Sequence, residues 1–319
     1  MEQPLPKIIA IVGPTASGKT GLSLALAKEF NGEVINADSR QVYTRMDIGT
    51  DKPAGEYVFP PGEKGKRKKS GGMFIAEGVP HHLVDIVDPG AEFTLADFKT
   101  RAQAAIDDIL KRGKLPIMVG GTGLYIWSIV DNLDMPKVAP NKSLRRCLEE
   151  KSLPELVRLL KLSDPEAAER VDLNNPRRVL RALEVWILTG ESFAKQQKKS
   201  APIYDVLQIA YDLPKETLKQ RIEERVGQQL DRGLVGETKS LVARKYGWNL
   251  PSMSSIGYRQ IGYFLRGEMS LEQAVECLKR DTRRYAKRQL TWFKRDKRIN
   301  WIKEESQARE LVNKFLENK

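Results

Sequence analysis

The N-terminal part of the chain alternates between short apolar runs and longer amphipathic stretches. Residues 7–12 form an apolar, β-branched run that stops at Gly13, which is typical of a buried strand. Three later runs have the same character and predict further strands, at residues 33–37, 82–87 and 115–119. The polar stretch from Asp38 to about Glu77 interrupts this pattern and predicts loops.

Helical spacing fills two of the intervals between these runs. Apolar residues recur at helical spacing directly after Thr20 and again over residues 95–109. Thr94 and Asp97 predict a capping box at the start of the second helix, and Gly113 predicts its end. Strands that alternate with helices predict an α/β fold, in which helices flank a parallel sheet.

The alternation stops near residue 126 and returns near residue 203. Between these points no strand pattern is convincing, and four stretches have helical spacing, at 142–151, 154–162, 165–171 and 176–188. Beyond them the pattern predicts a strand at 203–213, helices at 215–232, 236–245, 259–265 and 271–294, a short strand at 300–302 and a C-terminal helix. We therefore expect a core formed by residues 1–125 and 201–319, with helices in its C-terminal region, and an all-helical insertion domain at 126–200.

Composition and charge narrow the function classes. The chain has 319 residues, 40% of them hydrophobic and 30% charged, with a formal net charge of +12. Cys147 and Cys277 are far apart, and only His81 and His82 could join them, so a disulfide scaffold and a structural zinc site are unsupported. No apolar run approaches the ~18 residues that span a bilayer. We expect a monomeric cytoplasmic protein without a signal peptide or a membrane anchor.

A phosphate-binding motif lies between the first strand and the first helix. It matches G-x-x-x-x-G-K-[ST] and consists of Gly13, Pro14, Thr15, Ala16, Ser17, Gly18, Lys19 and Thr20. In such a loop the glycines let backbone N–H groups converge on phosphate oxygens, the lysine adds a positive charge, and the hydroxyl of Thr20 can bind Mg²⁺. The motif predicts a phosphate or diphosphate ligand and does not by itself specify ATP.

Two further strand ends carry polar residues. Asp38 ends the second predicted strand, where a carboxylate can accept a proton from a nucleophile, and Ser39, Arg40 and Gln41 follow it. A strand-end aspartate that caps a turn is the alternative. Residues 120–125 follow another strand, so their glycines can admit a substrate and Thr122 can donate a hydrogen bond, although an ordinary strand-to-helix turn has the same residues.

Basic residues are grouped on two predicted helices. Arg177, Arg178 and Arg181 share one helical sector, which suits a phosphate-binding face or a solvated one. Arg221 and Arg225 have the same spacing and the same two interpretations. The strongest group is residues 279–298, with ten Lys or Arg, two Asp and interleaved aromatic residues. This array suits an RNA backbone, whereas an amphipathic helix with buried aromatics is the alternative.

Seven motifs occur together in an order that resembles the tRNA dimethylallyltransferases, also called tRNA isopentenyltransferases. They are Gly13–Thr20, Asp38-Ser-Arg-Gln-Val-Tyr43, Met46-Asp-Ile-Gly-Thr50 with Lys52-Pro53, Gly120-Gly-Thr-Gly-Leu-Tyr125, Arg177-Arg-Val-Leu-Arg181, Ile256-Gly-Tyr-Arg-Gln260 and Ala286-Lys-Arg-Gln289. The resemblance covers nearly the whole chain and implies a P-loop NTPase-like core with a helical insertion. The zinc finger that eukaryotic members append is absent, so the resemblance is to the bacterial type.

The resemblance implies transfer of a dimethylallyl group from dimethylallyl diphosphate to the exocyclic amine of the adenosine 3′-adjacent to the tRNA anticodon, with Mg²⁺. Asp38 is then the general base, Thr20 a catalytic residue and metal ligand, Arg225 a second diphosphate contact, and residues 13–20 the diphosphate site. The implied tRNA contacts are Asp38, Ser39, Arg40, Gln41, Thr122, Arg145, Arg177, Arg178, Val179, Leu180, Arg181, Ser254, Ser255, Ile256, Gly257, Tyr258, Arg259, Lys287 and Arg288.

Two features depart from the family pattern, and two other functions stay open. Asn175 stands where relatives often have aspartate before the insertion arginines, and the basic run 64–69, with five Lys or Arg in six positions, inherits no role. If that run reaches tRNA, its contacts are non-specific phosphate contacts.

A P-loop nucleoside or metabolite kinase would also place an aspartate after the second strand. An RNA-binding protein with a degenerate phosphate loop is the second alternative.

Overall fold

The chain folds into two compact units, one of Met1–Val130 with Ile203–Lys319 and one of Asp131–Pro202. The computed structural model describes residues 4–59, 72–134, 138–196 and 199–318. The basic run 64–69 therefore lies outside the described residues. The predicted insertion boundary at residue 126 is wrong, because helix α3 (Gly123–Val130) belongs to the first unit, where Ile126 and Ile129 are buried against the sheet.

The first unit is built on one sheet of eight strands in the order β3-β4-β5-β2-β6-β1-β7-β8. Pairing is parallel from β5 to β8, and β4 is antiparallel to both of its neighbours. The strands are β1 (Lys7–Val12), β2 (Gly32–Asn36), β3 (Glu56–Val58), β4 (Met73–Ala76), β5 (Val79–His82), β6 (Leu115–Gly120), β7 (Asp205–Tyr211) and β8 (Ile299–Ile302).

Two differences from the sequence-based prediction lie at one side of the sheet. The strand predicted at 82–87 ends at His82, because Leu83 and Asp85 take positive φ angles of 62° and 55°, which no strand accommodates. The stretch predicted as loops contains β3 and β4, which form an antiparallel pair. The expected wholly parallel sheet is thus extended by an antiparallel edge.

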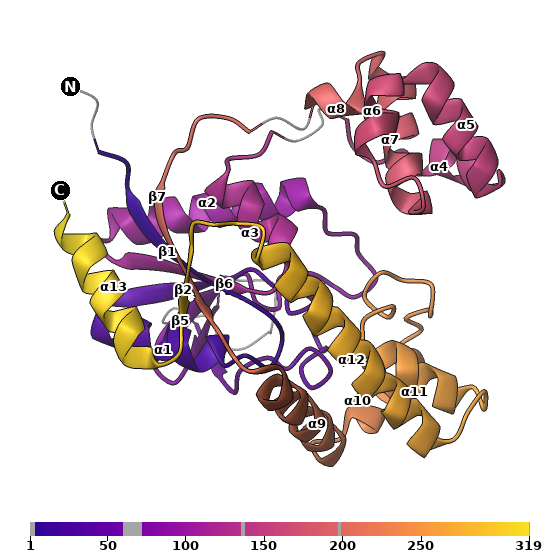
Figure 1. Ribbon diagram of the computed structural model, residues 1–319. Coiled ribbons are helices and arrows are strands. Elements are labelled where there is room, and N and C mark those ends of the chain that lie inside the picture. The colour runs from indigo at the N-terminus through magenta and orange to yellow at the C-terminus, as the bar shows by residue number, and fades with distance from the viewer. Residues whose placement is uncertain (1–3, 60–71, 135–137, 197–198, 319) are drawn as a thin grey trace. The chain divides into compact units, whose positions relative to one another are not determined.

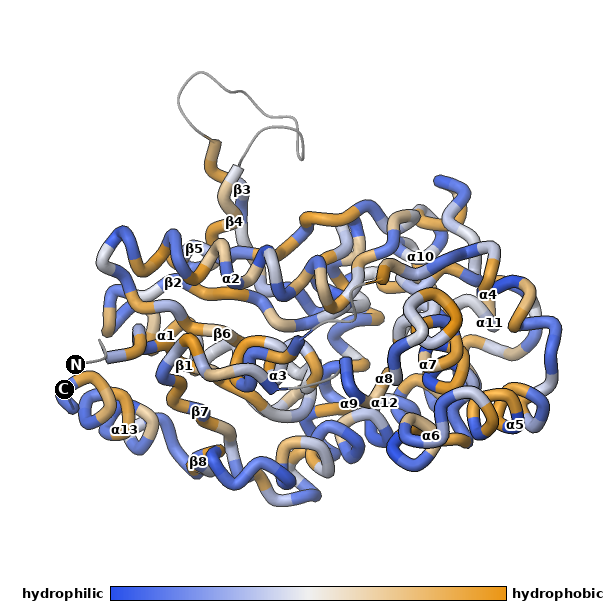
Figure 2. The backbone as a smooth tube through the Cα atoms, turned by 90° about the horizontal axis from the view of Figure 1, so that it is seen from above, coloured by the Kyte–Doolittle hydropathy of each residue, from blue (hydrophilic) through white to orange (hydrophobic). Residues whose placement is uncertain are grey.

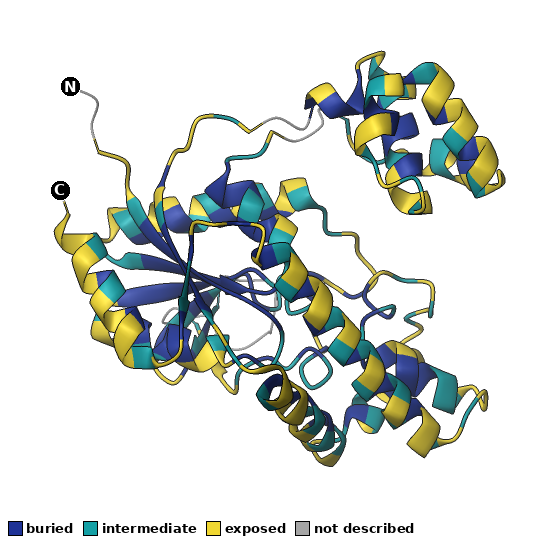
Figure 3. Ribbon diagram, in the orientation of Figure 1, coloured by how far each residue is buried: buried dark blue, intermediate teal, exposed yellow. Residues whose placement is uncertain are grey.

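Helices cover both faces of the sheet, as expected (Figure 1). Ile8, Ala10 and Val12 of β1 pack with α2 (Leu95–Lys111) and α3, whereas Ile9 and Ile11 pack with α1 (Lys19–Glu29) and α13 (Glu305–Glu317). Strands buried on both faces read as unbroken apolar runs. The central strands are accordingly dark blue by burial in Figure 3 and mainly orange by hydropathy in Figure 2.

Four further helices of this unit form a separate apolar core with the loop after β2. They are α9 (Lys215–Asp231), α10 (Leu234–Ala243), α11 (Tyr258–Leu265) and α12 (Leu271–Phe293). Val42, Met46, Val226 and Tyr258 are buried in this core, so the polar segment that follows β2 is fixed against the C-terminal helices. Among the described residues, no helix has the length and apolar character that a membrane span requires.

The second unit is a helical cluster, as the sequence predicts. Its helices are α4 (Lys142–Glu149), α5 (Leu153–Ser163), α6 (Pro165–Arg170), α7 (Pro176–Thr189) and the short α8 (Phe193–Gln196). Their core contains Leu148, Leu160, Val179 and Leu183. The side chain of Asn175 caps α7 by accepting a hydrogen bond from the Arg178 backbone, so the departure from aspartate keeps the cap.

Candidate active site

The phosphate loop joins β1 to α1 in the conformation that an anion site needs. Gly13 and Gly18 have φ angles of 133° and 93°, which only glycine adopts without strain. Ala16 also has a positive φ, at 61°, which costs of order 1 kcal/mol and is common at functional sites. Lys19 and Thr20 open α1, so the partial positive charge of a helix N-terminus lies beside them.

A cavity of about 330 Å³ brings the phosphate loop together with distant parts of the chain. Residues from the loop, the ends of β2 and β6, the segment after β2, α9 and α12 line it. The lining comprises residues 15–20, Asn36, Asp38, Gln41, Thr50, Asp51, Val119, Gly120, Gly121, Arg221, Glu224, Arg225, Gln228 and Gln289. Asp38 reaches this cavity from the end of β2, although β6 separates β2 from β1 in the sheet.

Three cations converge on the cavity. Burial, with the nearby Arg225 charge as the second cause, lowers the pKa of Lys19 to about 7, and its amine donates to the Pro14 carbonyl at 2.5 Å. Arg225 donates to the Thr15 hydroxyl at 2.7 Å, and Arg221 donates to the Ser17 carbonyl at 3.4 Å. Positive charge concentrated on a loop with a low-dielectric environment favours a polyanionic ligand.

Asp38 is held by the backbone that follows β2. Its Oδ1 accepts a hydrogen bond from the Arg40 backbone at 2.8 Å, and its own N–H donates to the side chain of Asn36 at 3.2 Å. Asn36 in turn donates to the Leu83 carbonyl at 3.0 Å. The second carboxylate oxygen of Asp38 has no hydrogen bond among the described residues. The carboxylate is therefore oriented and keeps one oxygen available for a proton.

Gln289 connects α12 to the phosphate loop, and sequence reasoning assigned it no role. Its Oε1 accepts a hydrogen bond from the Thr15 backbone at 2.9 Å, and its Nε2 donates to the Gly121 carbonyl at 2.8 Å. Asp51, Glu224 and Gln228 were missed as well. The resemblance marked Met46–Pro53 and Ala286–Gln289 as motifs, and those motifs were the available signal for Asp51 and Gln289.

The polar residues after β2 form one group with the turn after β6. The Thr122 hydroxyl accepts a hydrogen bond from the Ser39 backbone at 3.0 Å, and Gln41 donates to the carbonyls of Thr50 and Asp51, both at 3.1 Å. The Arg40 side chain donates to the Pro251 carbonyl. The structure thus brings Ser39 and Thr122 into contact beside Asp38 and holds Gln41 on the segment that contains Thr50 and Asp51.

The predicted tRNA-contact segment 254–259 is only partly accessible. Ser255, Gly257 and Tyr258 are buried, and Tyr258 belongs to the core with α10. Contact of these three residues with tRNA stays a prediction. Ser254 and Ile256 are half-buried. Arg259 is exposed and pairs with Asp281 at 3.0 Å.

The arginines of the helical unit are not equivalent. Glu184, fully buried, pairs with Arg145 at 2.8 Å and with Arg181 at 2.5 Å, so these two arginines stabilise the unit. Arg177 and Arg178 are exposed. Val179 and Leu180 are buried in the core of the unit, and their contact with tRNA stays a prediction.

The basic group at residues 279–298, on α12 and just after it, is partly neutralised by acidic neighbours. Lys279, Arg280, Arg283, Arg284 and Arg298 form ion pairs. Lys287 and Arg288 are exposed without an ion pair among the described residues, and Arg288 lies over the ring of Tyr285 at 5.8 Å. Among the described residues, the cations of this group that have no ion pair therefore lie between Lys287 and Lys297, on both sides of Gln289.

These features define a class: an α/β enzyme with a P-loop that binds a phosphorylated substrate beside a proton-accepting carboxylate. Comparison with known proteins identifies the family. The family model described as IPP transferase matches residues 41–296, and the model described as isopentenyl transferase matches residues 6–59. The chain belongs to the IPP transferase family, and it is a prenyltransferase.

Named relatives match nearly the full length. The tRNA dimethylallyltransferase 2 of Geotalea uraniireducens is 44% identical, over 98% of this chain and 96% of its own. The tRNA dimethylallyltransferase of Acetivibrio thermocellus is 43% identical, with the same two coverages of 98% and 96%.

Solved structures agree with these relatives. The full-length tRNA isopentenylpyrophosphate transferase of Bacillus halodurans has a TM-score of 0.67 at 38% identity, over 97% of this chain and 95% of its own. A eukaryotic dimethylallyltransferase acting on tRNA has a TM-score of 0.78 at 31% identity, over 98% of this chain and 80% of its own. The P-loop NTPase-like fold predicted from the sequence is confirmed.

Proposed function

We propose that this chain transfers a dimethylallyl group from dimethylallyl diphosphate to the exocyclic amine of the adenosine 3′-adjacent to the tRNA anticodon, releasing diphosphate. The observation that carries the proposal is one cavity in which the phosphate loop, Arg221, Arg225 and Asp38 meet. The cations favour the diphosphate end of a donor, and the carboxylate is available for the amine of an acceptor.

The leaving diphosphate determines the role of Lys19, Arg225 and the amides of the phosphate loop. As the carbon–oxygen bond of the donor breaks, negative charge grows on the diphosphate. Lys19, Arg225 and the loop amides are held in place before reaction, so they stabilise that charge without reorganisation. Residues 13–18, with Lys19 and Thr20, are the donor site in this proposal.

The acceptor needs a group that removes a proton, because an aromatic exocyclic amine is a weak nucleophile. Asp38 takes up the amine proton as the new carbon–nitrogen bond forms, which is worth ~10²–10⁴-fold in typical general-base catalysis. Ser39, Gln41 and Thr122 position the adenosine, since hydrogen bonds already hold Ser39 to Thr122 and hold Gln41 to the Thr50 carbonyl.

The donor set fits Mg²⁺. This ion prefers oxygen ligands and binds through few protein groups together with substrate phosphate oxygens. The hydroxyl of Thr20, exposed at the first turn of α1, supplies one such oxygen beside the diphosphate position. When bound, the ion adds Lewis-acid stabilisation of the leaving diphosphate.

The exposed cations supply the remaining contacts to tRNA. Lys287 and Arg288 on α12 suit the phosphates of an anticodon stem-loop, and Arg177 and Arg178 are exposed on the helical unit. A tRNA-modifying reaction also supports the cytoplasm as the place of action. A monomeric state stays a prediction.

Labelled dimethylallyl diphosphate, Mg²⁺ and an anticodon stem-loop with consecutive adenosines test the proposal. We expect label in the RNA and none in a matched stem-loop with inosine at the acceptor position, which lacks the exocyclic amine. The kinase alternative, which the comparisons do not favour, predicts phosphate transfer from ATP and no prenylation. RNA binding without turnover would support the non-catalytic alternative. Either of these outcomes would overturn the proposal.

A further inference from the structure

The segment Met46–Lys52 lines the donor cavity without regular structure of its own. Thr50 and Asp51 reach the cavity, and Asp51 has a positive φ of 56°. The segment contains only turns and irregular backbone. Its shape is therefore set by contacts from other elements, and those contacts decide where Asp51 lies.

Glu237 of α10 holds the middle of this segment. Its carboxylate accepts hydrogen bonds from three successive backbone N–H groups, those of Asp47 at 2.8 Å, Ile48 at 2.9 Å and Gly49 at 3.1 Å. The buried Tyr258 hydroxyl donates to the same carboxylate at 2.6 Å. Hydrogen bonds to an ionised acceptor are shorter and stronger than neutral ones, so this single side chain fixes three consecutive peptide groups.

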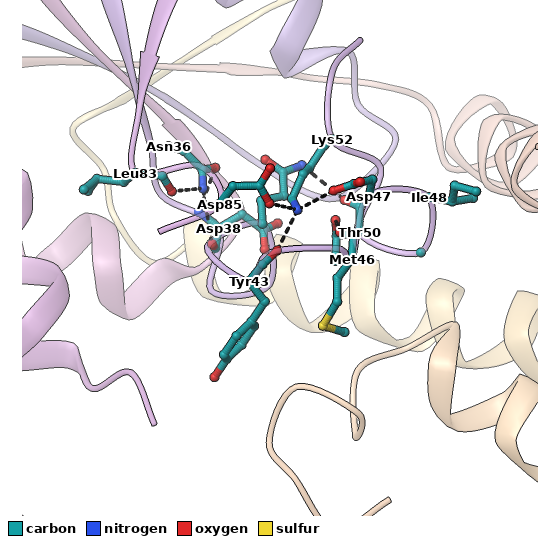
Figure 4. A network of polar contacts seen from close by, with 12 residues as sticks. Asn36, Asp38, Tyr43, Met46, Asp47, Ile48, Thr50, Lys52, Leu83 and Asp85 are labelled. Atoms are coloured by element: carbon teal, nitrogen blue, oxygen red, sulfur yellow. Dashed lines mark hydrogen bonds and ion pairs between the residues drawn. The ribbon is translucent and has the colours of Figure 1, made fainter. Parts of the chain in front are cut away.

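Two further side chains hold the flanks. Gln229 of α9 donates to the Ile48 carbonyl at 2.9 Å and to the Gly49 carbonyl at 3.3 Å. On the other side, the buried Lys52 donates to the Tyr43 carbonyl at 2.6 Å and lies between Asp47 and Asp85, as Figure 4 shows. Glu237, Gln229 and Lys52 thus fix the backbone of Met46–Lys52 beside the cavity.

Asp51, near the C-terminal end of the segment, contacts a cation of the donor site. Asp51 pairs with Arg225 at 3.1 Å and with Arg232 at 3.4 Å. Arg225 in turn donates to the Thr15 hydroxyl in the phosphate loop at 2.7 Å. A continuous series of contacts therefore leads from Glu237 through the segment and Asp51 to the guanidinium that faces the diphosphate.

We infer that Glu237 is a positioning residue of the donor site, which aims Arg225 at the diphosphate by holding Met46–Lys52 and hence Asp51. The inference rests on the proposed function, in which Arg225 binds the donor diphosphate. Glu237 itself does not line the cavity. Its effect on the donor must therefore pass through the segment that it holds, and the ion pair of Asp51 with Arg225 is the contact that carries this effect in our inference. A purely structural role would lower stability without selecting the donor.

Binding of inorganic diphosphate with Mg²⁺, measured by calorimetry on the full chain, tests this inference. Glu237→Gln keeps the size of the side chain but presents an N–H group to backbone donors, which breaks the clamp on one side. We expect about tenfold weaker diphosphate binding, within the range for coupled neighbours, and unchanged affinity for the anticodon stem-loop. Glu33→Gln is the matched control, because Glu33 is a buried, paired carboxylate at the opposite end of β2, and diphosphate affinity should stay at the wild-type value.

Testing Glu237→Gln also in the Arg225→Ala variant distinguishes failure of this inference from failure of the proposed function. In Arg225→Ala, we expect weaker diphosphate binding and no further loss when Glu237→Gln is added. An equal loss in both backgrounds, or wild-type affinity in Glu237→Gln, would overturn the positioning role. Wild-type affinity in Arg225→Ala would instead overturn the donor role of Arg225. If Glu237→Gln does not fold, Gln229→Ala loosens the same segment from α9 and should give the same pattern.

Discussion

Replacing Lys19 by arginine keeps a cation in the phosphate loop but removes its titration near neutral pH. Without a ligand, burial and then the Arg225 charge lower the pKa of Lys19 from 10.5 to about 7. A diphosphate beside the amine favours the charged form and raises this pKa again. An arginine stays charged throughout, because its pKa exceeds 12. We therefore expect donor binding to take up a proton at Lys19 in the wild type and not in Lys19→Arg.

The magnitude follows from linkage between the two states. Well below pH 7 the Lys19 amine is charged with and without ligand, so its charge fully supports binding and binding takes up no proton at this group. If binding restores the ordinary pKa of 10.5, the affinity falls about fiftyfold between pH 7 and 9, and about 0.9 proton is taken up at pH 8. The loss appears as the pH rises through the ligand-free pKa.

Calorimetry in two buffers of different ionisation enthalpy measures that proton uptake. A thio analogue of dimethylallyl diphosphate that does not react is the ligand, and wild type is compared with Lys19→Arg at pH 8. Titration of the ligand itself is common to both proteins, so the difference reports Lys19. Equal proton uptake by the two proteins would refute the reasoning, as would an affinity of wild type that is level from pH 7 to 9.

Three other single substitutions have expected outcomes. Asp38→Ala abolishes prenyl transfer in a single-turnover assay and changes tRNA affinity only a few-fold, because the carboxylate acts on the amine; near-normal rates would exclude the general-base role. For Glu33, burial opposes ionisation but hydrogen bonds from three basic neighbours lower its pKa to about 2, so its contribution is present above about pH 4.5 and lost as the pH falls towards 2. Urea unfolding at pH 5 and pH 3 should show this loss in wild type and a smaller one in Glu33→Gln. Glu184→Gln leaves Arg145 and Arg181 without their buried carboxylate and should destabilise the helical unit by about 3 kcal/mol; an unchanged melting transition would contradict this.

The features that the sequence predicts well are those whose causes lie close together in the chain. The phosphate loop occupies eight successive residues, and its glycines, lysine and threonine each have a local physical reason. The strand at Lys7–Val12 is apolar on both faces and is observed with the predicted bounds. The capping box of Thr94 and Asp97 is likewise confirmed, with both hydrogen bonds formed.

The features that the sequence does not predict depend on distant partners or on very short elements. β3 and β4 have three and four residues, too few for a periodic pattern. The contact of Gln289 with Thr15 spans 274 residues, and that of Glu237 with Asp47 spans 190. Val179 stood in a motif beside arginines, but the face of α7 that it occupies points to the core. Motif membership alone does not separate buried positions from exposed ones.

The bond between Gln289 and the phosphate loop has a consequence for synthesis of the protein. The loop leaves the ribosome among the first residues, whereas its partner on α12 follows after the whole helical insertion. A growing chain therefore contains the entire phosphate motif for most of its synthesis without the side chain that secures the Thr15 backbone. The hydrogen bond that holds the Thr15 backbone can therefore form only after α12 has emerged, late in the synthesis of the chain.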